Sequence, residues 1–290
     1  RASAALPLLA KIISDPATDA QRELKYFRAF DFHTGREKDK TLLSLLNGKH
    51  PQQDFIDALI LLQLDESTPR TASLKTAIEK GLKSVARTPY YLDLVKKYNL
   101  KDKNGELLRL TENAPTEEMK VSAMRLLIGQ GGSNLIEQKL VRNKNNPESL
   151  IELLAKTGND ESRKILNKFL VDTKQPFKFR VLALEAAARG RAGENNLLQI
   201  IKEKKLPEDL TQSAAHIFSK STRADLRDEA AKYLNIEIHT HQLPPLEEIM
   251  VMRGNTDSGL VAFTTYCGSC HQVKGQGIAF GPDLSEIGSK

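Results

Sequence analysis

Residues 178–189 read Lys-Phe-Arg-Val-Leu-Ala-Leu-Glu-Ala-Ala-Ala-Arg, a stretch that is apolar almost all round when it is drawn as a helix. Such a helix is buried on more than one side. Gly190 follows it as a stop signal. Residues 162–171 carry one apolar face instead, on which Ile165 and Phe169 are a turn apart. Because strand-like alternation is missing from residues 1–235, these patterns predict an all-α fold of short packed helices.

A similar nine-residue segment occurs three times, with a small residue at a fixed place. The fixed residues are Ala123, Ala183 and Ala214, which are 60 and then 31 residues apart. A period near 30 is typical of a repeated helix pair, in which small residues let two helices approach closely. The pattern resembles the HEAT-like repeat family. It predicts an α-solenoid of antiparallel helix pairs over residues 1–235, with a globular helical bundle as the alternative.

The composition is that of a globular chain, with 40% hydrophobic and 28% charged residues among 290. No apolar run is long enough for a transmembrane helix. Residues 247–290 carry a net charge of −2 within a total of +6, so residues 1–246 carry +8. A basic surface suits nucleic acid, but the cations are scattered and there is no Trp for base stacking. We therefore expect no nucleic-acid partner.

The helical part offers no catalytic constellation. His33, His50 and His216 are isolated, and a lone helical histidine is more often structural than a ligand. No glycine-rich phosphate loop and no nucleophile elbow is present. Whether the chain is an enzyme stays open, and residues 1–235 are interpreted as a scaffold.

Residues 236–246 change character, because they lack a helical period and contain Pro244-Pro245. This segment is the predicted linker between a helical repeat domain at 1–235 and a second domain at 247–290. We expect a short helix over residues 247–253, closed by Gly254. The chain as a whole is interpreted as a piece of a longer polypeptide.

Both cysteines of the chain fall in Cys267-Gly-Ser-Cys270-His271, which has the spacing of a c-type haem attachment site. One turn of chain brings both thiols within reach of the haem vinyl groups. His271 follows directly and lies where the proximal iron ligand is needed. The sequence therefore predicts haem c bound covalently by Cys267 and Cys270, with His271 as the metal ligand.

Three other interpretations of the motif exist. A thioredoxin-like redox pair needs a βαβ context, which the sequence lacks. Half of a zinc site would need a second pair of ligands, and His239 and His241 are the only donors nearby. Coincidence is the third, and it is improbable when the only two cysteines have this spacing and a histidine follows.

The surroundings of the motif resemble a small class I cytochrome c. Residues 254–267 resemble its first helix, and Gly281-Pro282-Asp283-Leu284 resembles its Gly-Pro-x-Leu turn. The resemblance implies that the carbonyl of Pro282 accepts a hydrogen bond from Nδ1 of His271 and so supports the iron ligand. The family's distal methionine and closing helix have no counterpart in residues 272–290. Residues 247–290 therefore resemble the first half of such a domain.

Helical repeats, a Leu-Pro-Pro-Leu linker and this motif occur together in a family that the chain resembles, the large haem-binding CxxCH proteins of Planctomycetes, Verrucomicrobia and Bacteroidetes. Its members carry an upstream propeller that resembles sugar dehydrogenases. The resemblance implies electron transfer from a sugar or alcohol dehydrogenase module to a redox partner protein. Covalent haem attachment implies a periplasmic or cell-surface location. The alternative is a protein-interaction scaffold with no redox role.

Overall fold

The computed structural model describes residues 3–142, 146–234, 246–268, 271–277 and 281–287. These residues are predominantly helical, which confirms the predicted all-α class. The strands among them are two short ones in a single hairpin. The chain divides into two compact units, residues 1–236 and 237–290. No helix in the described ranges has the length and hydropathy that a membrane crossing requires.

The first unit is built from helices of 8 to 13 residues joined by short connections, with 3-10 turns η1 (Ser3–Ala5), η2 (Phe30–Phe32), η3 (Lys101–Lys103) and η4 (Glu208–Leu210) between some of them. In chain order the helices are α1 (Leu6–Ile13), α2 (Ala20–Ala29), α3 (Arg36–Leu45), α4 (Gln53–Gln63), α5 (Ala72–Ser84), α6 (Pro89–Tyr98), α7 (Asn104–Asn113), α8 (Glu117–Gly129), α9 (Ser133–Arg142), α10 (Glu148–Thr157), α11 (Asp160–Val171), α12 (Phe177–Ala187), α13 (Gly190–Lys202), α14 (Thr211–Ser219) and α15 (Ala224–Ala231).

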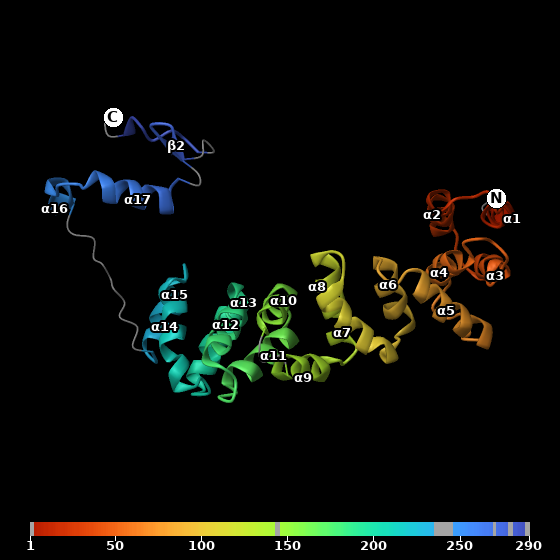
Figure 1. Ribbon diagram of the computed structural model, residues 1–290, viewed down its shortest axis with the longest axis horizontal. Helices are drawn as coiled ribbons and strands as arrows, with labels where there is room; N and C mark the ends of the chain where they lie inside the picture. The colour runs from red at the N-terminus through yellow and green to blue at the C-terminus, as the bar shows by residue number, and fades with distance from the viewer. Residues whose placement is uncertain (1–2, 143–145, 235–245, 269–270, 278–280, 288–290) are drawn as a thin grey trace. The chain divides into compact units, whose positions relative to one another are not determined.

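Within this unit the helices pack mainly on elements that are near them in the chain (Figure 1). One row is formed by the contacts of α4 with α6, α6 with α8, α8 with α10, α10 with α12 and α12 with α14. A second row is formed by α7 with α9, α9 with α11, and α13 with α15. Pairs such as α7 with α8 and α11 with α12 join the rows. Each helix is therefore placed by close neighbours.

The small residues of the recurring segment lie where helices touch. Ala123, Ala183 and Ala214 are all fully buried. A β-carbon added to Gly81 in α5 would lie 3.2 Å from the α-carbon of Ala58 in α4. A β-carbon on Gly193 in α13 would lie 2.5 Å from the backbone at the end of α12. These positions therefore permit only small side chains.

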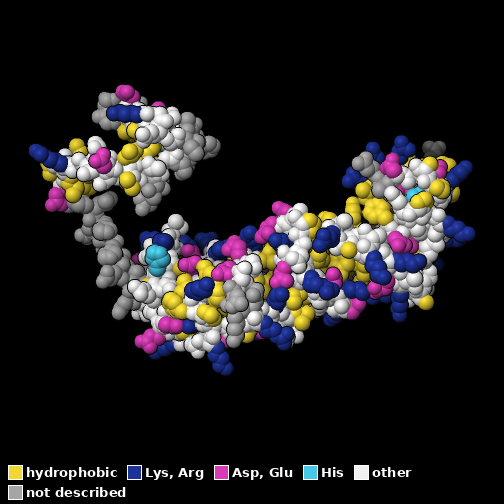
Figure 2. All heavy atoms as spheres, viewed as in Figure 1, with side chains coloured by type: hydrophobic (Ala, Val, Ile, Leu, Met, Phe, Trp, Pro, Cys, Tyr) yellow, Lys and Arg dark blue, Asp and Glu magenta, His cyan; other side chains and the backbone are white. Residues whose placement is uncertain are grey.

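Ion pairs connect successive helices of each row. Lys156 in α10 reaches Glu117 in α8 at 2.8 Å, and Lys139 in α9 reaches Glu112 in α7 at 3.0 Å. Such exposed pairs contribute about 0.2–1 kcal/mol each. Figure 2 shows Lys and Arg side chains spread along this face, with Asp and Glu among them. Some of the lysines of this unit are therefore paired with its own glutamates.

The second unit contains α16 (Leu246–Val251), α17 (Thr256–Tyr266) and a hairpin of β1 (Gln272–Val273) and β2 (Gln276–Gly277). Most of the predicted linker, residues 236–245, lies outside the described residues. Its last residue, Leu246, is the first residue of α16, so the short helix begins and ends slightly earlier than predicted. Met250 and Met252 are exposed, at 76% and 65%.

The burial of Ala183 makes a stability prediction. Replacing Ala183 with Leu puts three extra carbon atoms into the contacts of α12, and overpacking of this kind costs about 1–3 kcal/mol. We expect a lower midpoint of chemical denaturation for Ala183→Leu. Ala192→Leu is the matched control, because Ala192 is an exposed residue of the next helix. Equal midpoints for the two variants would contradict the packing described here.

Candidate haem-attachment site

The segment that carries the motif begins with α17. The side chain of Asn255 caps this helix by accepting a hydrogen bond from the amide of Ser258 at 2.9 Å. At the other end, the amides of Cys267 and Gly268 both donate to the carbonyl of Phe263, at 2.8 and 2.7 Å. The amide of His271 then donates to the carbonyl of Cys267 at 2.9 Å. These hydrogen bonds tie Cys267 and Gly268 to the end of α17 and bring the backbone of His271 back to Cys267.

The hairpin that follows presses its second strand against this turn. Lys274 and Gly275 connect β1 to β2, and both have positive φ, at 48° and 80°. This is the φ pattern of a type I′ turn, which matches the twist of the paired strands. Gly277 has φ of 97°, and a β-carbon there would lie 2.2 Å from the carbonyl oxygen of His271. Only glycine fits at Gly277.

The loop at residues 281–287 reaches the imidazole of His271. Nδ1 of His271 lies 2.8 Å from the carbonyl oxygen of Pro282. A carbonyl oxygen only accepts, so Nδ1 carries a proton, and in the neutral imidazole Nε2 then has the lone pair. This is the hydrogen bond that the family resemblance implies. The role of Pro282 as support for an iron ligand stays a prediction.

The donor groups near His271 fit a covalently bound haem. Cys267 has a free, half-buried thiol, and the oriented imidazole offers Nε2 to a metal. Cys270 lies outside the described residues, as do His239 and His241. Among the residues that are described, no group of three or more His, Cys, Asp and Glu side chains is arranged to hold a metal ion.

The contacts of Ser285 with Asp283 and Lys274, beside the motif, were not predicted from the sequence. The hydroxyl and the amide of Ser285 both donate to Asp283, at 2.5 and 2.8 Å, and these hydrogen bonds lower the pKa of the Asp283 carboxyl. The amide of Lys274 donates to the same hydroxyl at 2.7 Å. The Asp-x-Ser spacing is a local signal for such a turn, but the partner across the hairpin has no signal in the sequence.

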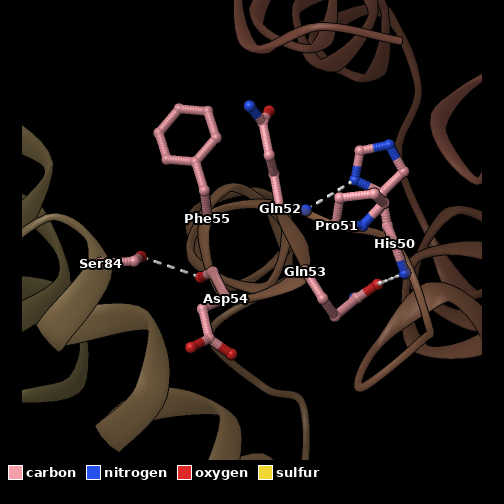
Figure 3. A pocket seen from close by; sticks show the side chains of 7 residues that line it. All are labelled: His50, Pro51, Gln52, Gln53, Asp54, Phe55 and Ser84. Carbon is pink, nitrogen blue, oxygen red and sulfur yellow. Dashed lines mark hydrogen bonds between the residues drawn. The ribbon is translucent and has the colours of Figure 1, made fainter. Parts of the chain in front are cut away.

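A hollow in the first unit surrounds the first turn of α4, and seven residues line it: His50, Pro51, Gln52, Gln53, Asp54, Phe55 and Ser84. Figure 3 shows that the side chains of Gln52, Asp54 and Phe55 point in different directions from the helix. The hydroxyl of Ser84 donates to the carbonyl of Asp54. Because these polar groups do not converge, we assign no chemistry to this hollow.

His50 is a buried structural histidine, as expected of a lone one. Its Nδ1 accepts a hydrogen bond from the amide of Gln52 at 3.1 Å, so Nε2 carries the proton and donates to the carbonyl of Asp15. The fully buried Glu23 lies 3.9 Å from this Nε2. Neither carboxyl oxygen of Glu23 has a hydrogen-bond partner among the described residues. Burial, and secondarily the charge of Asp19, raise the pKa of Glu23 to about 7.

Comparison with known proteins gave no match, whether with family models, with curated proteins or with solved structures. The site at residues 267–285 is therefore defined by its own residues and contacts.

The close approach of Gly277 to His271 leads to a second prediction. Gly277→Ala places a methyl group against the His271 carbonyl and strains a residue at positive φ. We expect faster hydrogen exchange at the amides of Lys274 and Leu284, whose hydrogen bonds join the hairpin to the loop at residues 281–287. Gly259→Ala is the control, because a β-carbon there meets nothing within 4 Å. Unchanged protection in Gly277→Ala would show that the hairpin does not press on the motif.

The raised pKa of Glu23 predicts a pH dependence of folding stability. The folded state binds this proton more tightly than the unfolded state, whose carboxyl has a pKa near 4.5. The protein should therefore lose stability as the pH rises from about 4.5 to 7, by on the order of 3 kcal/mol from this group. Glu23→Gln should remove that loss while keeping the shape of the side chain.

The measurement is the unfolding free energy of wild type and variant at several pH values. The buried Asp57, whose pKa is also raised by burial, is present in both proteins and cancels in their difference. Glu118→Gln, at an exposed site, is the control for loss of one carboxyl. A constant difference between wild type and Glu23→Gln across this pH range would refute the assignment.

Proposed function

We propose that residues 247–290 carry a covalently attached c-type haem and that the chain transfers single electrons through it. The observation that supports this most directly is the contact between Nδ1 of His271 and the carbonyl of Pro282 at 2.8 Å. The histidine is the last residue of a Cys-x-x-Cys-His motif, and a hydrogen bond at Nδ1 orients the imidazole as a haem ligand needs.

Each residue of the site has a distinct part in this proposal. Cys267 and Cys270 form thioether bonds, which fix the ring to the chain. His271 would bind the iron through Nε2, while its Nδ1–H donates a hydrogen bond to the carbonyl of Pro282. The bound haem supplies one-electron redox chemistry, and the chain supplies attachment, ligation and the local charge.

For residues 1–235 we propose a HEAT-like α-solenoid of antiparallel helix pairs that acts as a scaffold. Support comes from packing in two rows of neighbouring helices and from the buried alanines that recur at a fixed place. The scaffold would tether the cytochrome c-like residues 247–290 to an upstream sugar or alcohol dehydrogenase-like module. Electrons would then pass to a redox partner protein outside the cytoplasm, where covalent haem attachment takes place.

Haem attachment is tested by producing the 290-residue chain with and without the cellular machinery that attaches haem c. With the machinery, we expect a mass increase of one haem that survives denaturation. Cys267→Ala combined with Cys270→Ala should abolish it, whereas Ser258→Ala, at an exposed site of α17, should leave it unchanged. Without the machinery the chain should be haem-free. A chain that never acquires haem would favour the scaffold function alone.

The absorption spectrum of the loaded chain provides a further test. Residues 272–290 contain no methionine, and the exposed Met250 and Met252 precede the motif. We therefore expect an open or weakly occupied sixth position on the iron. A low-spin spectrum with methionine ligation would contradict this expectation, and substitution of Met250 and Met252 would then show whether either one supplies the ligand.

A further inference from the structure

The loop that bears Pro282 is attached to the hairpin at two points. The amide of Leu284 donates to the carbonyl of Gln272 at 2.9 Å, and the amide of Lys274 donates to the hydroxyl of Ser285 at 2.7 Å. All four residues that make these two hydrogen bonds lie within three positions of His271 or of Pro282 in the chain. The second contact is the only one of the two that a side chain makes, so it can be removed by mutation.

The direction of the Ser285 hydroxyl is fixed by Asp283. A serine hydroxyl has one proton, and the carboxylate of Asp283, at 2.5 Å, is where that proton points. The oxygen of Ser285 therefore presents a lone pair to the amide of Lys274. The result is a directed chain of hydrogen bonds from the Lys274 amide through Ser285 to Asp283.

The Lys274 end of this chain is held by the turn. Lys274 and Gly275 both adopt positive φ, as a type I′ turn requires, and the Lys274 amide bonds to Ser285. Gly277 holds the hairpin against the carbonyl of His271. Hence the acceptor for the imidazole, Pro282, is tied through Ser285 to the same hairpin that contacts the backbone of His271.

We propose that Ser285 is a positioning residue for the haem ligand: its hydroxyl, oriented by Asp283, holds the Pro282 carbonyl against Nδ1 of His271. The inference rests on the proposed haem-binding function. By keeping the proton on Nδ1, Ser285 sets which nitrogen faces the iron and strengthens His271 as an electron donor.

The first experiment needs no haem. The full chain is labelled with ¹⁵N-histidine, and the tautomer of His271, assigned with His271→Gln, is read by NMR at about pH 8, where an ordinary histidine is neutral. The wild type should hold the proton on Nδ1. Ser285→Ala should raise the ratio of the Nε2–H to the Nδ1–H form roughly three- to ten-fold, the scale of one lost hydrogen bond.

Ser285→Thr keeps the hydroxyl and should restore the wild-type ratio, and Ser258→Ala should not alter it. Asp283→Asn, which weakens the acceptor without changing the shape, decides the question if Ser285→Ala does not fold. The second experiment measures the reduction potential of the haem-loaded chain, which should become more positive in Ser285→Ala because the ligand donates less.

The outcomes separate the two proposals. If Ser285→Ala matches the wild type both in the tautomer of the haem-free chain and in the reduction potential of the loaded chain, the positioning role is overturned and haem binding is left intact. A chain that takes up no haem even with the attachment machinery, but in which Ser285→Ala still shifts the tautomer, would support the positioning of the imidazole and refute the proposed function. A wild type whose His271 holds its proton on Nε2 would also overturn the positioning role.

Discussion

A β-carbon on Gly81 would lie 3.2 Å from the α-carbon of Ala58, so α4 and α5 meet at backbone distance. The same constraint acts further along the chain at Ala123, Ala183 and Ala214, whose side chains are fully buried. Contact this close fixes both the distance and the angle between the two helices. Because the contacts run mainly between elements that are near in the chain, each described helix of the first unit is placed by its neighbours. In the proposed solenoid, a misfit at one contact would displace the helices beyond it.

Polar contacts fix which segments of the chain lie opposite each other in this packing. Arg180 is an example. Its buried guanidinium donates from Nε to the carbonyl of Leu170 at 2.8 Å and, through both terminal nitrogens, to Asp209 at 2.6 and 3.0 Å. The paired guanidinium lowers the pKa of the Asp209 carboxyl. A buried cation without its partner would be strongly destabilising. The pair therefore specifies that the segment containing Asp209 packs against α12. Exposed pairs such as Lys156 with Glu117 add little to either stability or specificity.

The sequence predicts the features that repeat or that chemistry constrains. The alanine positions follow from a period, because they depend on local spacing. The contact of His271 with Pro282 is what the resemblance to class I cytochrome c implies. Contacts between remote residues leave no such pattern. Glu23 looks like an ordinary first-turn acid of α2, and its burial beside His50 depends on how the α3–α4 connection folds. The fork of Arg180 on a residue 29 positions away is equally invisible in the sequence.

The proximal side of the proposed haem site is assembled from one continuous stretch of chain. Its contacts, from the carbonyl of Phe263 to the hydroxyl of Ser285, are all made within residues 263–285, and they include backbone bonds that any sequence could form. What is specific is the set of positive φ angles at Lys274, Gly275 and Gly277, which close the hairpin onto His271. In the proposed site, an imidazole held by such local contacts would be oriented before haem is attached, so less conformational freedom would be lost when the iron is bound. The donor strength that the proposal gives to His271 would then be set by this short segment of chain.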